Sequence, residues 1–363
     1  HFYKPLGRNS VAAASCAAGR TIPRPGGPAR QCHEQSCDRG LCPAGGVPRK
    51  LARVSFTDPA VNDSHRAALR SIARVVEEKA VPTPPEEALE RIVGQLGRGP
   101  SLVLTGAGVS TDSGIPDYRG PRGSLSRHRP MTYQEFRHDP AASQRYWARS
   151  FVGWRQMYVA EPNRTHFALV ELERAGFLHG VVTQNVDGLH RAAGSEKLLH
   201  LHGDLDTVMC LDCGRREDRA IFDERLEAAN PGYLASISLD PAMVNPDGDV
   251  TLPQEAVNRF HMVGCVRCGS RRLKPDVVYF GEPVPQHRKQ DAARMLDGAA
   301  SLLVVGSSLA VMSGYRFVLD AQRQGKAVSV INGGPGRADH RVDVLWRTPV
   351  APAFDALLDA LSL

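Results

Sequence analysis

Short apolar runs that end in glycine or polar residues recur between residues 101 and 334 and predict the strands of one sheet. These runs are SLVLTGAGVS from Ser101, VVTQNV at 181–186, SLLVVGSS at 301–308 and AVSVINGG at 327–334. Continuous apolar runs are typical of parallel strands covered on both faces, and the intervening segments are long enough for crossover helices. We therefore predict an α/β fold with a Rossmann-like, doubly wound parallel sheet. Its ligand site is expected beyond the carboxyl ends of the strands.

The same pattern predicts how the chain is divided. The sequence PPEEALERIVGQL, Pro84 to Leu96, has apolar residues at helical spacing and acidic residues in its first turn, so we expect the folded part to begin there. The stretch from about 200 to 280 breaks the strand pattern and is rich in Pro, Asp and Asn near its middle. We predict a sheet domain formed by 84–199 and 291–363, with residues 200–290 inserted as a small lobe.

The net charge of +6 is concentrated at the N-terminus. Residues 1–60 contain nine Lys or Arg against Glu34, Asp38 and Asp58, which accounts for the whole excess and leaves the remainder neutral. We therefore expect no nucleic-acid partner. The segment is rich in Gly, Pro, Ala and Arg without periodicity, so residues 1–83 are predicted to be a largely disordered arm. Its first 33 residues lack acidic side chains, which is typical of a mitochondrial transit peptide. The same composition arises when GC-rich bacterial sequence upstream of the true start codon is translated.

The distribution of apolar residues also bears on location. No run of 18 or more uncharged apolar residues exists, which predicts no membrane-spanning segment, and the N-terminus lacks the apolar block of a secretory signal. We expect the protein in the bacterial cytoplasm, with the mitochondrial matrix as the alternative. The oligomeric state is left open by the sequence.

Four of the eight cysteines form two strict C-x-x-C pairs, Cys210 with Cys213 and Cys265 with Cys268. This spacing predicts one tetrahedral Zn²⁺ with four sulfur ligands, and a metal with no open position for water has a structural role. A redox pair is the alternative, but no thioredoxin-like context or oxidising compartment is indicated. The other cysteines lie in the arm without paired spacing; they are Cys16, Cys32, Cys37 and Cys42.

Two polar clusters follow predicted strands. The first is GAGVSTDSGIPDYRG at 106–120, in which a glycine turn leads to Asp117, Tyr118 and Arg119. A strand followed by a tight turn and then a helix would suit the binding of a pyrophosphate. The glycine turn alone is weak evidence, because such turns are common punctuation in α/β folds. The second cluster is Gln184-Asn185-Val186-Asp187, for which an ordinary strand-end turn is the alternative.

The first cluster resembles the cofactor loop of the sirtuin family, which usually has Phe where Tyr118 stands. The resemblance spans residues 84–363 and extends, in family order, through TQNVDGLH (183–190), HLHGD (200–204), the cysteine pairs, KPDVVYFGE (274–282), GSSLAV (306–311) and INGG (331–334). PDYR and RYWARSFVGW (145–154) are more specifically similar to the class II branch, which includes the mitochondrial sirtuin noted for ADP-ribosylation and lipoamide-type deacylation. The resemblance implies NAD as co-substrate and acyl-lysine proteins or peptides as substrates.

The resemblance also implies a mechanism. The acyl carbonyl oxygen attacks C1′ of the nicotinamide ribose, and His202 is the general base that then helps a ribose hydroxyl attack the resulting O-alkylimidate. Imidazole suits this task because its ordinary pKa leaves a neutral base near pH 7. His200 would share the face of His202 on a strand, and only the His-Gly step after His202 distinguishes the two.

Further site residues are carried over from the family. Asn185 would hold the ribose and an ordered water, Asp187 the nicotinamide carboxamide, and Tyr118 would shield the developing cation from water. The complete set of implied cofactor contacts is Gly106, Ala107, Gly108, Ser110, Thr111, Ile115, Asp117, Tyr118, Arg119, Gln184, Asn185, Val186, Asp187, Gly306, Ser307, Ser308, Asn332, Gly333, Gly334 and Val350. The strand-like segment VVYFGE is expected to pair with substrate backbone, a buried hinge strand being its alternative.

The sequence therefore predicts an NAD-dependent protein-lysine deacylase that releases nicotinamide, O-acyl-ADP-ribose and free lysine. An NAD-dependent protein mono-ADP-ribosyltransferase and a non-catalytic NAD sensor are the alternatives. A dehydrogenase is disfavoured, since no acidic residue is identifiable at the usual second-strand position. The identity of the acyl group is left open.

Overall fold

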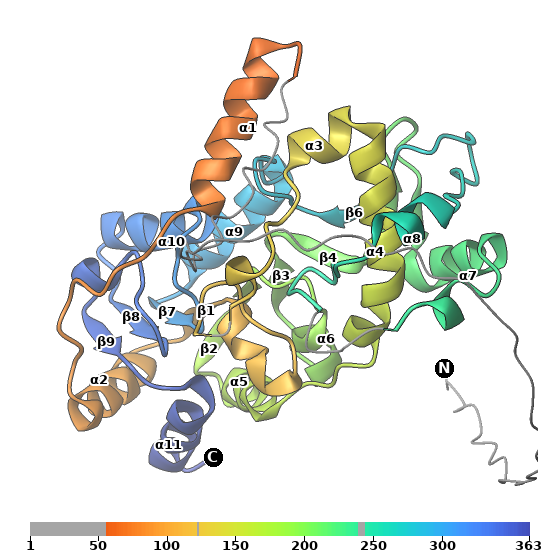
Figure 1. Cartoon of the computed structure of the whole chain (residues 1–363). Coiled ribbons are helices and arrows are strands. Elements are labelled where there is room, and N and C mark those ends of the chain that lie inside the picture. Colours follow the sequence, from red (N-terminus) through yellow and green to blue (C-terminus); the bar gives the residue numbers. More distant parts are fainter. Residues whose placement is uncertain (1–55, 122, 239–243) are drawn as a thin grey trace, which may run out of the picture. The chain divides into compact units, whose positions relative to one another are not determined.

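The computed structural model describes residues 56–121, 123–238 and 244–363, and Figure 1 shows its helices and strands. In chain order the strands are β1 (Ser101–Thr105), β2 (Leu178–Thr183), β3 (Leu198–His200), β4 (Gly203–Cys210), β5 (Arg216–Asp218), β6 (Leu273–Val277), β7 (Ser301–Val305), β8 (Val328–Ile331) and β9 (Val344–Trp346). The α-helices are α1 (Pro59–Ile72), α2 (Pro85–Gly97), α3 (Tyr133–His138), α4 (Pro140–Tyr158), α5 (Arg164–Arg174), α6 (Leu189–Ala193), α7 (Arg219–Ala229), α8 (Gln254–Arg259), α9 (Gln286–Gly298), α10 (Met312–Arg323) and α11 (Val350–Leu361).

Six strands form a parallel sheet in the order β3-β2-β1-β7-β8-β9. The four strands predicted from apolar runs are β1, β2, β7 and β8, and the helix predicted from Pro84 is α2, so the predicted fold class is confirmed. The edge strand β9 was not predicted, and β3 was anticipated only as the strand expected to carry His200 and His202. Each has three residues, which is too short for a recognisable periodicity.

Helices cover both faces of this sheet, which explains why its strands are apolar on both sides. Helices α2, α5 and α11 pack on one face, where Ile92 and Phe354 meet Val103. Helices α9 and α10 pack on the other, where Val318 belongs to the same core as Leu102. All five residues of β1 are buried. The polar ends of the central strands therefore lie at one edge, between two helical layers.

A second, three-stranded antiparallel sheet has the order β5-β4-β6 and forms the smaller part. Helices α3 and α4, which precede it in the chain, share its core, as Trp147 and Phe151 of α4 pack with Phe222 of α7. The Trp147 indole Nε1 also donates to the Leu273 carbonyl oxygen of β6 at 2.8 Å. The small lobe thus includes residues from within 84–199, the range predicted for the larger domain.

The predicted arm contains a helix that the sequence analysis did not assign. Helix α1 begins after Asp58, whose carboxylate accepts from the Ala60 amide, and it packs against α3. His65 on α1 lies 3.0 Å from the Thr132 hydroxyl. The prediction of an unstructured segment up to residue 83 is therefore wrong for residues 59–72. The first 55 residues, with the four cysteines Cys16, Cys32, Cys37 and Cys42, lie outside the described residues.

The segment VVYFGE is not a strand beyond its first residue, since β6 ends at Val277. Residues 279–282 form a turn instead, in which the Glu282 amide donates to the Tyr279 carbonyl at 2.9 Å. Gly281 has φ +84°, a left-handed conformation that ends extended structure. Among the described helices, none has the length and apolar character needed to cross a bilayer.

Candidate active site

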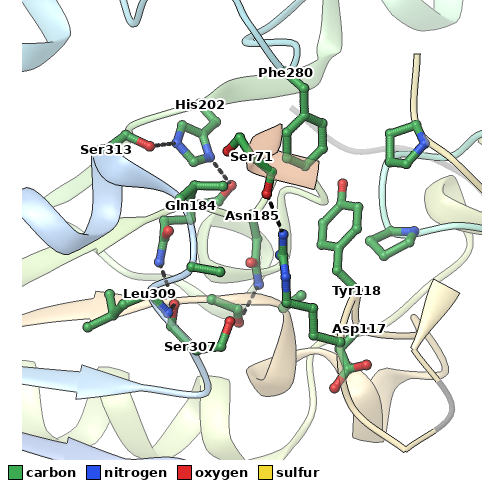
Figure 2. A pocket seen from close by; sticks show the side chains of 18 of the residues that line it. Ser71, Asp117, Tyr118, Gln184, Asn185, His202, Phe280, Ser307, Leu309 and Ser313 are labelled. Carbon is green, nitrogen blue, oxygen red and sulfur yellow. Dashed lines mark hydrogen bonds between the residues drawn. The ribbon is translucent and has the colours of Figure 1, made fainter. Parts of the chain in front are cut away.

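A cavity of about 1290 Å³ opens where strands β1, β2, β7 and β8 end. Figure 2 shows several of its side chains, which come from segments far apart in the sequence. Of the implied cofactor contacts, all but Thr111, Gly333 and Val350 line it, as does His202. Thr111 is exposed and its hydroxyl donates to the Gly108 carbonyl, while Val350 opens α11 and packs with the sheet core.

Glycines bring the β1 and β7 turns into backbone contact at the cavity floor. The Gly108 amide donates to the Gly306 carbonyl oxygen at 2.9 Å. A Cβ on Gly106 would lie 2.7 Å from that of Ser307, and Gly306 has φ +60°. No larger residue fits these positions without displacing backbone. The helix expected after this turn is absent: the chain makes two 3-10 turns, at Ala107–Val109 and Thr111–Ser113.

The second polar cluster is tied to the first by a hydrogen-bond chain through Ser110. The Asn185 amide donates to the Ser110 hydroxyl and to the Gly106 carbonyl, both at 3.0 Å. The Ser110 hydroxyl donates to the Asp187 carboxylate at 2.7 Å. Burial raises the pKa of Asp187, although the Leu189 amide and the Ser110 hydroxyl oppose this shift. Such a network holds Asn185 and Asp187 in one orientation before any ligand binds.

His202 lies between a carbonyl oxygen and a hydroxyl. Its Nδ1 is 3.0 Å from the Gln184 carbonyl and its Nε2 is 2.8 Å from the Ser313 hydroxyl. Because a carbonyl can only accept, the proton of the neutral ring is on Nδ1, which leaves the Nε2 lone pair as the basic site. Burial lowers the pKa of His202 to about 4, and Arg288 adds to this, while the Gln184 carbonyl acts in the opposite direction. The imidazole is therefore neutral at pH 7.

His200 does not share this environment, contrary to the expected alternation. Strand β3 ends at His200 and the chain turns at Leu201 and His202, so the period of two is lost. The His200 Nε2 lies 3.1 Å from the Arg191 guanidinium, and His200 does not line the cavity. The structure thus separates the two histidines that the strand pattern left equivalent.

Asp117, Tyr118 and Arg119 all line the cavity, and Figure 2 labels the first two. The Asp117 carboxylate accepts from the Gly120 amide at 2.8 Å and closes its own turn. Burial raises the pKa of Tyr118 well above its ordinary value, so its phenol stays neutral, and its ring meets Phe280 edge to face at 6.0 Å. The Arg119 guanidinium donates to the carbonyl oxygens of Ser71 and Ile72, the last turn of α1.

Several cavity residues were missed by sequence reasoning. Ser313 and the segment 71–76 line the cavity although no motif points to them, and Leu309, which lies within the motif GSSLAV, was not among the implied cofactor contacts. Leu309 has φ +52°, a strained conformation for a branched side chain, and its amide donates to the Ser307 hydroxyl. The motif GSSLAV ends two residues before Ser313. The closeness of this motif to the start of α10 was the one signal in the sequence that could have pointed to Ser313.

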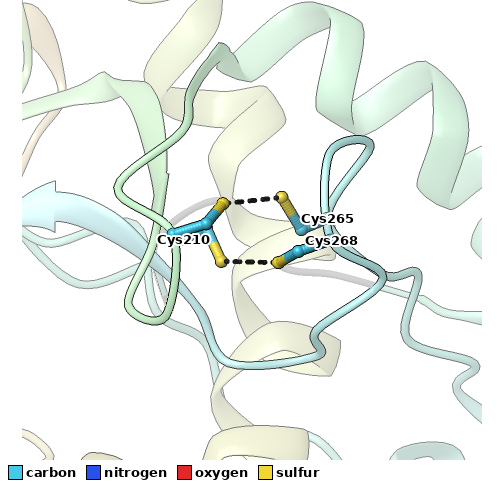
Figure 3. Close-up of side chains that lie close together, drawn as sticks. Cys210, Cys265 and Cys268 are labelled. Carbon is cyan, nitrogen blue, oxygen red and sulfur yellow. Dashed lines mark hydrogen bonds between the residues drawn. The ribbon is translucent and has the colours of Figure 1, made fainter.

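The four predicted cysteine ligands come together at the end of the small sheet (Figure 3). Their sulfur atoms all lie within 4.8 Å of one another, and those of Cys210 and Cys268 are 3.6 Å apart. Four sulfurs at about 2.3 Å from a central Zn²⁺ would be separated by roughly 3.8 Å in a tetrahedron, so the group fits this metal. A disulfide would need about 2.05 Å, and the cysteines are free. The predicted zinc site is thus supported by geometry.

Comparison with known proteins places these features in a family. Residues 106–313 match the model of the Sir2 family. The chain is 71% identical over 276 residues to NAD-dependent protein deacetylase 1 of Corynebacterium efficiens, covering 76% of this chain and 98% of that protein. It is 44% identical to the mitochondrial NAD-dependent protein lipoamidase sirtuin-4 of Bos taurus, covering 80% of this chain and 90% of that protein.

The fold has solved counterparts as well. A complex of Sir2 with a p53 peptide and NAD⁺ superimposes with a TM-score of 0.60 at 26% identity, covering 76% of this chain and 98% of that one. Another Sir2 structure, at 30% identity, gives a TM-score of 0.59. With the family model spanning more than half of the chain and a relative covered almost completely, this protein belongs to the Sir2 family, the sirtuins.

Proposed function

We propose that this protein is an NAD-dependent protein-lysine deacylase. The observation that carries the proposal is the neutral imidazole of His202, a cavity-lining ring that is fixed by Gln184 at Nδ1 and whose basic Nε2 lies beside Ser313, which lines the same cavity. A base held in one tautomer in the same cavity as the glycine turn can take a proton from a ribose hydroxyl. The deacetylase names of bacterial relatives at 71% and 50% identity support the same activity.

The other cavity residues have distinct proposed tasks. Asn185, held by Gly106 and Ser110, would orient the ribose and a water. Asp187 would accept from the nicotinamide amide, and Tyr118 would cover the reacting carbon and exclude water. The glycine turn and the Ser307 end of β7 would hold the remaining dinucleotide, which is a co-substrate consumed in each turnover. Zn²⁺ on the four cysteines would stabilise the small lobe, and it would take no part in the chemistry because its four positions are filled.

The test is incubation of the full chain with NAD and acetyl-lysine or longer acyl-lysine peptides. Deacylation predicts equal amounts of nicotinamide, free-lysine peptide and O-acyl-ADP-ribose by mass spectrometry. His202→Ala should still bind NAD but lose turnover, whereas the matched His200→Ala should retain turnover because His200 does not line the cavity. Nicotinamide release with ADP-ribose on protein and no free lysine would instead identify a transferase.

A further inference from the structure

One part of the cavity contains polar groups that the proposed chemistry does not use. Tyr146 from α4, Tyr279 after β6, and Asp247 all line it, among the apolar side chains of Ile115 and Met131. The rings of Tyr146 and Tyr279 are 5.4 Å apart between centroids. The charge of Asp247 is close enough to act on both phenols, whose pKa is raised chiefly by burial. We name these three side chains the polar cluster.

Both phenol oxygens of the polar cluster are buried without a hydrogen-bond partner. Tyr146 is 3% exposed and Tyr279 is 9% exposed. The hydroxyls of Tyr279 and Ser150 lie close enough to influence the pKa of Tyr146, but neither phenol oxygen has a partner at normal hydrogen-bond geometry. Buried hydroxyls without partners are costly and uncommon in native structures. A ligand atom that accepts or donates at this point would recover that cost.

The tyrosine rings are held in place by their surroundings. Tyr279 stacks on Phe136 at 5.0 Å, and the ammonium of Lys274 lies 5.1 Å from its ring centroid. Tyr146 meets Phe136 and Trp147 edge to face. These contacts restrict the rings, so the hydroxyls are preorganised for a ligand that reaches them.

The charge in this region is negative. Asp247 forms no ion pair within the described part of the chain, whereas its neighbour Asp249 lies 2.9 Å from His128. Burial and the nearby Asp249 raise the pKa of Asp247 to about 6, which still leaves it ionised at pH 7. Arg129, which also lines the cavity, is neutralised by a two-point contact with Glu135 at 2.6 and 2.9 Å. A carboxylate placed beside Asp247 would meet a like charge.

We propose that the polar cluster selects acyl-lysine substrates whose acyl chain ends in a neutral hydrogen-bonding group, such as a hydroxyl or a carboxamide. Plain aliphatic chains leave the buried hydroxyls unpaired, and carboxylate-terminated chains are repelled by Asp247. Sites built to pair with a polar group discriminate strongly against analogues that lack it. The inference rests on the proposed deacylase function, because the acyl chain enters the cavity only as part of that substrate.

The test compares kcat/KM for one peptide whose lysine carries one of four six-carbon acyl groups: hexanoyl, 6-hydroxyhexanoyl, adipamoyl or adipoyl. These end in a methyl, a hydroxyl, a carboxamide and a carboxylate. A second series has the same four end groups on four-carbon chains. At one of the two lengths, the hydroxyl and carboxamide chains should exceed the aliphatic chain by about tenfold, the worth of one net hydrogen bond. The carboxylate chain should be the poorest. Equal rates for all end groups, or a preference for the carboxylate through Arg129, would overturn the proposal.

Substitutions locate the effect. Tyr146→Phe and Tyr279→Phe keep the ring packing, and each should lower the ratio of hydroxyl to aliphatic substrate several-fold. Asp247→Asn should raise the relative rate for the carboxylate chain. Tyr133→Phe is the matched control, since that hydroxyl accepts from Arg137 on the surface of α3, and its ratios should equal those of the unaltered protein. If no acyl peptide leads to release of nicotinamide, the proposed deacylase function is wrong. Turnover without a preference among end groups would refute only the proposed role of the polar cluster.

Discussion

The Nδ1 atom of His202 lies 3.0 Å from the carbonyl oxygen of Gln184, the residue that follows strand β2. This contact joins two residues that lie 18 positions apart in the sequence, and it sets the tautomer of the ring. The opposite nitrogen accepts from Ser313, which belongs to α10 in the last third of the chain. The basic site therefore depends on three segments that meet only in the folded protein.

The pH dependence of turnover should reflect the unusual environment of His202. Only the neutral ring can accept a proton, so activity is lost as pH falls through the pKa of the folded protein. Since burial lowers that pKa to about 4, kcat/KM should hold well below pH 6.5. Ser313→Ala removes a donor that favours the neutral ring, and the acidic limb should move to higher pH. Profiles that coincide for the two proteins, with a limb near 6.5, would contradict this assignment.

Acid should destabilise the fold through its buried histidines. Burial lowers the pKa of His166 to about 4, against 6.5 for an exposed ring, and the side chain is fully buried. Between pH 6.5 and pH 4 this histidine is protonated in the unfolded chain but still neutral in the folded protein. The free energy of unfolding therefore falls as pH falls, by about 3 kcal/mol at pH 4 for this group. Urea midpoints at pH 7 and pH 4.5 measure the loss.

A pair of variants isolates this histidine effect. His166→Gln should reduce the difference between the two urea midpoints, although it also changes the cap of α5 that His166 forms with Asn163. His287→Gln provides the control, because His287 is exposed on α9. An equal change in both variants would show that His166 is not the titrating group.

Loss of the metal should weaken the small lobe and, through it, turnover. Cys213→Ser removes one of four sulfurs that lie within 4.8 Å, so the purified protein should contain less zinc and unfold at lower temperature. Elemental analysis and thermal melts measure both. Chelation of the unaltered protein should reproduce the result, with recovery on adding Zn²⁺. Full turnover by zinc-free Cys213→Ser would refute a structural role for the site.

Helix α1 should assist NAD binding through Arg119. The guanidinium donates to the Ser71 and Ile72 carbonyls, and Ala68 on the buried side of α1 packs against Gly281. Ala68→Glu would place a charge in that contact, displace the helix and raise the KM for NAD several-fold. The neighbouring Ala67 is exposed, so Ala67→Glu makes the same change without loss of packing. Identical kinetics for the two variants would show that α1 is not part of the site.

Much of the fold follows from local pattern. The apolar runs of β1, β2, β7 and β8 predict a parallel sheet because residues buried on both faces must be apolar. The C-x-x-C pairs predict a common metal, since each turn already holds two sulfurs together. The glycine turn at Gly106 was also identifiable from the sequence, because all of its residues are adjacent in the chain.

Other features were hidden because they depend on contacts between distant segments. The sequence placed His200 and His202 on one face, and the turn after β3 separates them. It assigned α4 to the larger domain, whereas the small sheet takes Trp147 into its core. It also left α1 unassigned, since a short helix at the start of the fold depends on packing against α3.

The amino-acid order alone therefore predicted the fold class, the four-cysteine group and the strand ends where a cofactor would lie, because each arises from residues within one turn or one strand. Only the tertiary structure showed that His202 lines the cavity and His200 does not, brought Ser313 and Arg119 to their partners, and grouped Tyr146, Tyr279 and Asp247 in one part of the cavity. Tautomer, pKa and unpaired hydroxyls depend on burial and on neighbours supplied by other segments, and these exist only once the chain has packed.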